Sequence, residues 1–367
     1  MSELDGLRLH GASISYFTGK LEAALRYKEL SYTFVATSPD RLRERAAAAQ
    51  VPALELADGR WATDTTPILA WLDALHPESS LTPADPALAF YARLVEDYAD
   101  EWLWRPAMHY RWSYEADRFL CAGLLADEFA GHLKVPRWLV RRRIARRQLG
   151  NFVTGDGVDA GSRPHVEATY RRALSLMSDA LAEHPFLFGD RPTLADIGLM
   201  GPMLRHFAHE PTPAWIMVQE APRVFSWVAR TWSARASELG DAPLVDALTP
   251  ALEALLVEIG ETHLTSLAAN AEAWAAGATR HEMTIQGAHY RGARVSRYRV
   301  WCLEQLRAGF AALPPAIAEG VKATLEATGC WAPLMRYDGP PSGHDPQGAA
   351  PFGVGLETIQ VDRESAG

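Results

Sequence analysis

The sequence of 367 residues is poor in cysteine and contains no long hydrophobic run. Its three cysteines, Cys121, Cys302 and Cys330, are far apart and form no CxxC pair. This argues against a disulfide framework and a cysteine-based metal site, and it is typical of a reducing compartment. No stretch approaches the roughly 18 apolar residues of a transmembrane helix. The N-terminal MSELDGLRLH lacks the apolar core of a signal peptide. We therefore expect a cytoplasmic protein without a membrane partner.

An excess of positive charge is also missing. The 36 Lys and Arg residues against 45 Asp and Glu residues give a net charge of −9, which excludes a globally basic surface for nucleic acid. One basic run, 137–147, carries six arginines and indicates a solvated helix, or else a site for a phosphate-bearing ligand or a partner. With 48% hydrophobic residues the composition is that of a globular protein, and the length predicts about two to three domains.

Residues 1–80 have the pattern of a small α/β domain. The Asp58-Gly59 turn predicts a hairpin, and Thr65 or Thr66 is expected to cap a following helix with Pro67 in its first turn. The predicted order is β-α-β-α-β-β-α. Its strands are expected at 7–9, 31–35, 53–56 and 60–63, and its helices from about Gly19, over 41–49 and after Thr65.

A proline-containing linker, 81–86, leads into a region with helical patterns only, 86–238. Pro106 is expected to kink or end the first helix, and the Gly- and Asp-rich segment 151–163 reads as an exposed loop. The sequence therefore predicts an all-α second domain. Its first helix is expected to present an apolar face from Leu88 to Trp102. Further helices are expected at 116–131, 135–148, 163–184, 194–208 and 220–238.

The remaining residues form a mainly helical extension, 239–337, and a Gly/Pro-rich tail, 338–367. Helical patterns cover 248–276 and 297–328, and between them 281–290 alternates like a hairpin around Gly287. The tail lacks its own core and can be ordered only if it lies across another part of the molecule. Because Ile285 replaces the second histidine that a zinc helix beginning at His281-Glu282 would need, we predict no metal.

Three short motifs in the first domain carry chemistry. The loop 11–20 places hydroxyls ahead of a helix N-terminus, where a donor and the helix dipole would stabilise a bound thiolate; an ordinary helix cap explains it equally. Val51-Pro52 precedes a strand and suits a cis bond beside an extended peptide, or simply a first strand residue. Asp64-Thr65 could hold the ammonium and carboxylate of an amino acid, or could only cap a helix.

In this order, these motifs resemble the glutathione transferase family. The resemblance rests on SYFTGKLEAAL at 15–25, QVPAL at 50–54, DTTPI at 64–68 and FGDRPTLADI at 188–197, where Thr193 and Asp196 form a capping box. It covers about residues 5–235. It implies an α/β thioredoxin-like glutathione-binding domain, then an all-α domain that holds the second substrate, with the helical extension beyond.

The resemblance also implies roles for individual residues. Ser15 falls at the position that donates to the glutathione sulfur, while Tyr16 is an alternative that needs a two-residue gap, with Ser13 or Thr18 behind them. Because the loop has no cysteine, the thiol-transferase branch is disfavoured. The remaining contacts to glutathione are implied for Phe17, Gln50, the Val51 backbone, cis-Pro52, Asp64 and Thr65.

The aromatic stretch 101–112 is expected to face the glutathione sulfur and bind the acceptor, although large aromatics at helical spacing also fill cores. The resemblance implies an enzyme of detoxification that attacks a small aromatic or apolar electrophile with the glutathione thiolate, and a homodimer. The alternative is a non-catalytic binding or interaction protein on the same fold. The candidate acceptor residues are Trp102, His109, Tyr110, Arg111 and Trp112.

Overall fold

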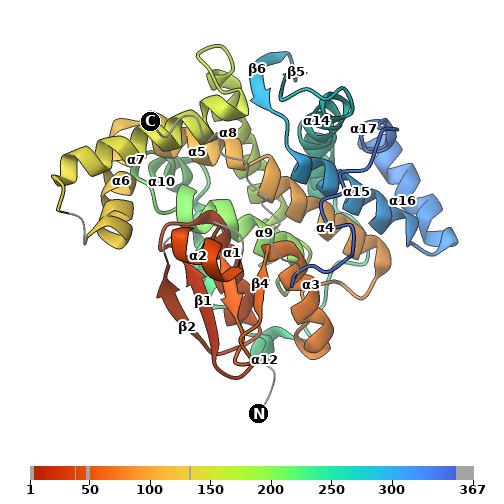
Figure 1. Cartoon of the computed structure of the whole chain (residues 1–367). Coiled ribbons are helices and arrows are strands. Elements are labelled where there is room, and N and C mark those ends of the chain that lie inside the picture. Colours follow the sequence, from red (N-terminus) through yellow and green to blue (C-terminus); the bar gives the residue numbers. More distant parts are fainter. Residues whose placement is uncertain (1–3, 38, 47–49, 132–133, 353–367) are drawn as a thin grey trace.

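The computed structural model of the chain describes residues 4–37, 39–46, 50–131 and 134–352 (Figure 1). Its first part is a four-stranded sheet of order β2-β1-β3-β4, in which β1 runs parallel to β2 and antiparallel to β3. The element order β-α-β-α-β-β-α confirms the prediction. The elements are β1 Leu7–Gly11, α1 Tyr16–Tyr27, β2 Tyr32–Ala36, α2 Pro39–Ala46, β3 Ala53–Glu55, β4 Trp61–Thr63 and α3 Thr65–Leu75.

Two helix starts differ from the prediction and bear on the site. Helix α1 begins at Tyr16 rather than near Gly19, because the Ser15 side chain accepts the backbone N–H of Thr18 as an N-cap. Helix α3 is capped by Asp64, whose carboxylate accepts the N–H of Thr66, so the expected cap at Thr65 or Thr66 lies one or two residues too late. Both side chains therefore stand at helix N-termini, where the dipole favours negative charge.

The second part contains only helices, as predicted. Pro106 has no N–H to donate to the carbonyl of residue 102, and the first helix breaks there into α4 and α5. The helix α10 was not among the predicted helices; it begins with prolines at 211 and 213, and proline fits a first helical turn. The helices are α4 Pro86–Glu101, α5 Trp104–Ser113, α6 Glu115–Ala130, α7 Arg137–Phe152, α8 Arg163–Ala180, α9 Leu194–Pro202, α10 Pro211–Glu220 and α11 Pro222–Ser233.

Helix α9 lies at the centre of the molecule, against α1 and α4 (Figure 1). Its start is the predicted capping box of Thr193 and Asp196. The Asp196 carboxylate, fully buried, also accepts the N–H of Leu187 at 3.0 Å and the indole N–H of Trp227 at 3.1 Å. Gly198 lets α4 approach closely, since a Cβ there would lie 2.7 Å from the Glu96 Cα. One carboxylate thus organises the entry to the central helix.

The extension packs on the outer side of α4, and the predicted hairpin at 281–290 is confirmed as β5 and β6. In Figure 1 most of its helices lie beside α4, away from the sheet, but the short helix at 236–239 lies next to the sheet domain, where the Ser237 N–H donates to Glu29. The indole of Trp301 is buried within it, which fits its expected capacity to bury apolar surface. Its elements are α12 Ala236–Leu239, α13 Pro250–Ile259, α14 Thr265–Ala275, β5 Arg280–Ile285, β6 Ala288–Arg294, α15 Arg297–Ala311, α16 Pro315–Ala327 and α17 Trp331–Met335.

Carboxylates of α4 that are buried or nearly so bind basic side chains from the other two parts of the chain. Glu96 pairs with the ammonium of Lys20 from α1 at 2.5 Å. Asp97 pairs with His263 at 2.7 Å, and Glu101 pairs with Arg299 at 3.0 Å, both from the extension. Since a buried charge without a partner is costly, these pairs tie the three parts of the chain together.

The described part of the tail lies across the first domain. This is the arrangement expected for an ordered tail that has no core of its own. The carbonyl of Pro351 accepts the N–H of Thr63 in β4 at 3.0 Å, and Phe352 packs edge-on against Trp71.

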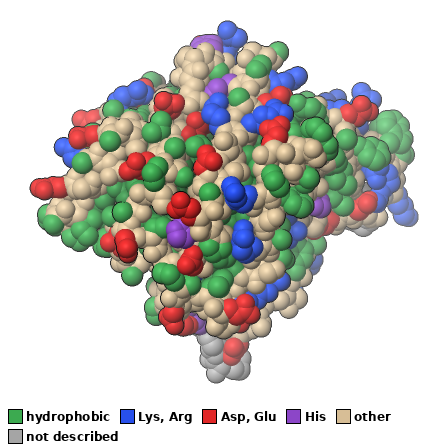
Figure 2. Space-filling view, turned by 180° about the vertical axis from the view of Figure 1, so that it is seen from behind, with side chains coloured by type: hydrophobic (Ala, Val, Ile, Leu, Met, Phe, Trp, Pro, Cys, Tyr) green, Lys and Arg blue, Asp and Glu red, His purple; other side chains and the backbone are tan. Residues whose placement is uncertain are grey.

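None of the described helices combines the length and apolar character needed to cross a bilayer. Seen from behind, hydrophobic side chains gather where α6 and α7 project, with Lys and Arg beside them (Figure 2). Phe119 and Trp138 are 68% and 61% exposed there.

Removal of the buried Asp196 carboxylate should destabilise the whole fold. In Asp196→Ala, the N–H groups of Leu187, Thr193 and Trp227 lose their acceptor in a place that water does not reach. At about 1–3 kcal/mol for each unsatisfied group, we expect a loss of at least about 3 kcal/mol in urea unfolding. The exposed Asp179→Ala is the control and should change stability by less than about 0.5 kcal/mol. Equal stability of the two variants would contradict this role.

Arg299 should anchor the extension, because it bridges the buried Glu101 and Asp156 at 3.0 Å each. Arg299→Leu leaves two buried carboxylates unpaired, and we expect a loss of about 3–5 kcal/mol at pH 7. Burial raises the pKa of Asp156, but Arg299 and Arg105 outweigh it and lower the pKa below its usual value. The Asp156 contribution is therefore present above about pH 4 and is lost as the pH falls through the lowered pKa.

The deficit of the Arg299→Leu variant should consequently shrink in acid, as both carboxylates take up protons. Chemical unfolding measured between about pH 2.5 and pH 8 tests this, because the Asp156 contribution is lost only below about pH 4. Arg291→Leu, which removes an exposed arginine 3.7 Å from Asp159, is the matched control and should cost about 1 kcal/mol at most. A pH-independent deficit would mean that Arg299 acts through packing alone.

Candidate functional site

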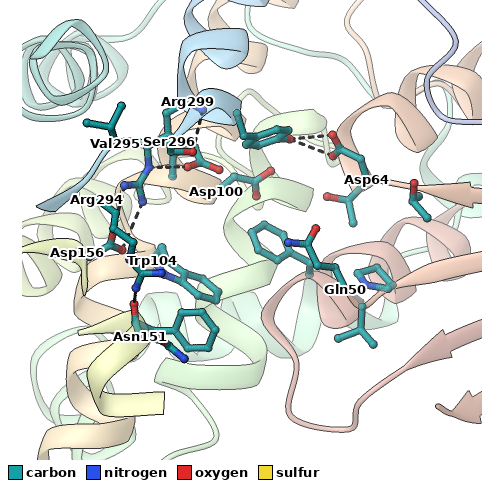
Figure 3. Close-up of a pocket in the computed structure, with 18 residues that line it drawn as sticks. Gln50, Asp64, Asp100, Trp104, Asn151, Asp156, Arg294, Val295, Ser296 and Arg299 are labelled. Carbon is teal, nitrogen blue, oxygen red and sulfur yellow. Dashed lines mark hydrogen bonds and ion pairs between the residues drawn. The ribbon is translucent and has the colours of Figure 1, made fainter. Parts of the chain in front are cut away.

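A pocket lies where the sheet domain, the helical domain and the extension meet (Figure 3). The helical domain lines it with Asp100, Glu101, Trp104, Asn151, Phe152 and Asp156, and the extension with Arg294, Val295, Ser296, Tyr298 and Arg299. The sheet domain lines it with Phe17, Gln50, Val51, Pro52, Thr63, Asp64 and Thr65. The six residues proposed to contact glutathione, Phe17, Gln50, Val51, Pro52, Asp64 and Thr65, are therefore all brought to one cavity.

The peptide side of the pocket is built from the ends of two strands. The Val51-Pro52 bond is cis, as the sequence suggested, and precedes β3. Thr63 ends the neighbouring strand β4, and Thr65 begins α3. Val51 and Thr65, the first residue of α3, thus line the same cavity, an arrangement suited to an extended peptide with a terminal carboxylate.

Asp64 is the most constrained residue of the site. Its backbone adopts φ 70°, which residues other than glycine rarely take and which occurs mostly at functional sites. Burial raises the pKa of its carboxyl to about 6, although hydrogen bonds from Tyr298 and Thr66 and the charges of Lys20 and Arg93 favour the ionised form. The dashed lines to Asp64 in Figure 3 are the bonds from the Tyr298 hydroxyl, at 2.9 and 3.1 Å.

Asp100 brings a second carboxylate to the same end of the pocket. One oxygen lies 2.5 Å from the buried Lys20 ammonium, and the other has no hydrogen-bond partner among the described residues. Burial raises the pKa of Asp100 well above its usual value despite Lys20. The neighbouring Glu96, held by Arg93 and Lys20, keeps a lowered pKa. This end of the pocket is rich in carboxylates and suits a positively charged group.

The four hydroxyl candidates of the first loop differ in their surroundings, and Thr18 is fully buried in the first turn of α1. Ser15 is half-buried; its oxygen accepts from Thr18, so its O–H remains available to donate, although Ser15 is not among the residues that line the pocket. Tyr16 is buried and its hydroxyl donates to the carbonyl of Ala99. Ser13 donates to Glu128 of α6. Phe17, the next residue after Tyr16, does line the pocket.

Aromatic rings form one wall of the pocket. Phe17 and Trp104 stack with their centroids 5.8 Å apart, and Phe152 meets Trp104 edge-on at 5.4 Å. Arg294 of the extension lies at the end of this wall and donates to the carbonyl of Asn151. The wall offers an apolar surface with a cation at its edge.

The five residues expected at the acceptor lie elsewhere: all are buried and none lines the pocket. The Trp102 ring packs under Arg105, the His109 ring bonds Glu167 at 2.9 Å, and Arg111 pairs with the buried Glu210. Tyr110 stacks on Tyr114. The helix break after Glu101 turns Trp104 toward the cavity instead. Their placement is therefore a correction: Trp102, His109, Tyr110, Arg111 and Trp112 fill the core of the helical domain, the alternative that their size allowed.

The sequence also missed the residues of the far wall. The segment 151–163 was expected to be an exposed loop, but Asn151 and Asp156 are buried because Arg294 and Arg299 cover them. Nothing local in the sequence pairs residues more than 140 positions apart. The only available signal was the accumulation of polar residues in this segment, and that signal does not distinguish a solvated loop from a buried ion pair.

No metal centre accompanies the pocket. Within the described ranges, no group of three or more His, Cys, Asp or Glu side chains has the arrangement of a metal site. The three cysteines are buried, and burial raises the pKa of Cys121 to about 12 and that of Cys330 to about 11. Any thiolate used at this site would therefore come from a ligand.

Comparison with known proteins agrees with this geometry. Residues 9–80 match the glutathione S-transferase N-terminal domain, and residues 142–230 match the glutathione S-transferase C-terminal domain. The chain is similar to the isoprene-epoxide–glutathione S-transferase of Rhodococcus sp. strain AD45, with 25% identity over 227 residues, or 59% of this chain and 91% of that protein.

Solved structures of the same kind are also similar. A glutathione S-transferase from Rhodospirillum rubrum F11 has 20% identity, covering 66% of this chain and 96% of its own, at a TM-score of 0.43. The beta-etherase LigF from Sphingobium sp. strain SYK-6 has 21% identity, covering 64% and 98%, at a TM-score of 0.45. With both domain matches in the family's order, the chain belongs to the glutathione S-transferase family.

Proposed function

We propose that this protein is a glutathione transferase that activates the glutathione thiol for attack on a small aromatic or apolar electrophile. The observation that carries the proposal is the convergence of cis-Pro52, Asp64 and Thr65 on one pocket with an aromatic wall. The N–H of Thr65 would hold the γ-glutamyl carboxylate, Asp64 its ammonium, and the Val51 backbone the cysteinyl part. Gln50 would contact the rest of the tripeptide.

Ser15 is our candidate for activating the thiol. Its hydroxyl caps α1 and still has a proton to donate, so hydroxyl and helix dipole would together stabilise a thiolate. A free thiol has a pKa of about 8.5, and a decrease of one to two units makes it largely ionised at neutral pH. Tyr16 is the weaker alternative, because burial raises the pKa of its hydroxyl well above the usual value and Ala99 already accepts its proton.

The acceptor would lie against Phe17, Trp104 and Phe152 rather than against the buried aromatics of α5. Binding there would place an apolar electrophile beside the thiolate and supply catalysis by proximity. Conjugation, dehalogenation, ether cleavage and isomerisation are all open to this chemistry. The relative named for an isoprene epoxide fits a small electrophile.

The second candidate is a non-catalytic glutathione- or ligand-binding protein on the same fold, favoured by the absence of Ser15 from the pocket lining. A cytoplasmic location, a role in detoxification and a homodimer also remain proposals. Sedimentation of the purified chain tests the last of these.

Glutathione titration followed by ultraviolet absorbance of the thiolate tests the transferase proposal. The wild-type protein should bind glutathione, as measured by calorimetry, and should lower the pKa of the glutathione thiol. Ser15→Ala should keep this binding but lose turnover by about 10²–10⁴-fold. Thr18→Ser, a conservative change in the same helical turn, is the control. Unchanged turnover in both Ser15→Ala and Tyr16→Phe would overturn the mechanism, and binding without any turnover would favour the second candidate.

Trp104→Ala should raise KM for the acceptor and leave glutathione affinity nearly unchanged, because the ring stacks on Phe17 at the acceptor wall. An aromatic contact of about 1–2 kcal/mol corresponds to about a ten-fold rise. The measurement is steady-state kinetics on a panel of electrophiles at saturating glutathione. Trp138→Ala, an exposed tryptophan on α7, is the control. A parallel loss in both variants would place the acceptor elsewhere.

A further inference from the structure

The extension contributes a polar side chain to the glutathione end of the pocket, outside the residues that match the family. We propose that Tyr298 of α15 is a positioning residue of the glutathione site, which keeps the Asp64 carboxylate charged and oriented for the ammonium of the γ-glutamyl group. The inference rests on the proposed function. It assigns the tuning of that site to a segment outside the residues that match the two family domains.

The contact geometry supports this role. The Tyr298 hydroxyl lies 2.9 Å from one Asp64 oxygen and 3.1 Å from the other, and both residues line the pocket. The backbone N–H of Thr66 also donates a hydrogen bond to this carboxylate, at 3.3 Å. A carboxylate accepts about four hydrogen bonds, so Asp64 retains capacity for an incoming ammonium. Tyr298 thus orients the Asp64 carboxylate without using all of its capacity to accept hydrogen bonds.

The tail and the helix hold Tyr298 in this position. Its side chain is nearly buried, its ring packs on Trp301 with centroids 5.3 Å apart, and His344 of the tail meets it edge-on at 5.1 Å. Burial and the negative charge of Asp64 raise the pKa of Tyr298 well above its usual value. The hydroxyl therefore stays protonated and can only donate to the carboxylate.

Charged groups on two other helices and a backbone N–H of α3 act on Asp64. Lys20 of α1 and Arg93 of α4 favour its ionised form, and Thr66 of α3 adds its N–H. Asp100 and the Cys302 thiol also lie nearby; burial raises the pKa of both well above the usual range. Burial lowers the pKa of His344 and so favours its neutral imidazole. Among the described residues, Tyr298 is thus the uncharged side chain that donates hydrogen bonds to Asp64.

The consequence is a specific pH dependence. Capture of the ammonium needs ionised Asp64, so glutathione affinity should fall as the pH falls through about 6. Removing the Tyr298 hydroxyl removes a donor to the charged form. The fall should then begin at a higher pH, and at neutral pH part of the Asp64 population would already be protonated.

The test is Tyr298→Phe in the full chain, which keeps the ring and its packing. First, the Asp64 carboxyl is titrated in the protein without glutathione by carbon-13 magnetic resonance, with Asp64→Asn to assign the signal. We expect its midpoint to move upward by about one pH unit. Second, calorimetry with glutathione at pH 5.5 to 8 should show about a three-fold weaker affinity near pH 6.5, a larger loss at pH 5.5 and almost none at pH 8.

Two controls separate this role from a structural one. Tyr170→Phe removes a buried hydroxyl that donates to the Pro213 carbonyl, and it should change neither the Asp64 titration nor glutathione binding. In an Asp64→Asn background, Tyr298→Phe should have no further effect on the pH profile.

An unchanged Asp64 midpoint in Tyr298→Phe would overturn the inference while leaving the proposed function intact, and so would an affinity loss that is equal at every pH. Wild-type protein that fails to bind glutathione while the Asp64 midpoint still shifts would overturn the proposed function and the γ-glutamyl role, and would leave only the Tyr298–Asp64 coupling. The outcomes are therefore distinct for the two claims.

Discussion

The buried carboxylates of α4 impose the constraint on which the architecture depends. A helix that carries Glu96, Asp97 and Glu101 into the interior is stable only if each charge meets a partner there. The partners come from the sheet domain and from the extension, so the three parts of the chain must dock on the same helix. Apolar packing supplies most of the free energy of such an assembly, but the ion pairs define where each part must sit.

The pocket is a result of this docking. It lies at the carboxyl end of α4, where Asp100 and Glu101 face the ends of β3 and β4 on one side and Arg299 on the other. Its chemistry changes along its length, from carboxylates and helix N-termini at one end to stacked aromatic rings and Arg294 at the other. Such a gradient suits a ligand with an amino-acid head and an apolar reaction partner.

Features with a local cause were readable from the sequence. The Asp58-Gly59 turn, the capping box of Thr193 and Asp196 and the cis bond before Pro52 each depend on a few adjacent residues, and the structure contains all three. The contributions of Tyr298 and Arg299 were not readable, because their partners lie more than 140 positions away. The aromatic stretch failed for a different reason: spacing shows that residues share a helix face, but not whether that face meets a cavity or a core, and here the break at 102–103 decided it.

The distance along the chain between the walls of the pocket has a consequence for synthesis. Domains emerging from a ribosome fold from the N-terminus onward, so the sheet domain and most of the helical domain are complete before α15 exists. Until Arg299 arrives, Glu101 and Asp156 lack the cation that bridges them. In a nascent chain that ends before α15, these carboxylates therefore lack Arg299, and the wall of the pocket that α15 supplies is added only after both family domains have been synthesised.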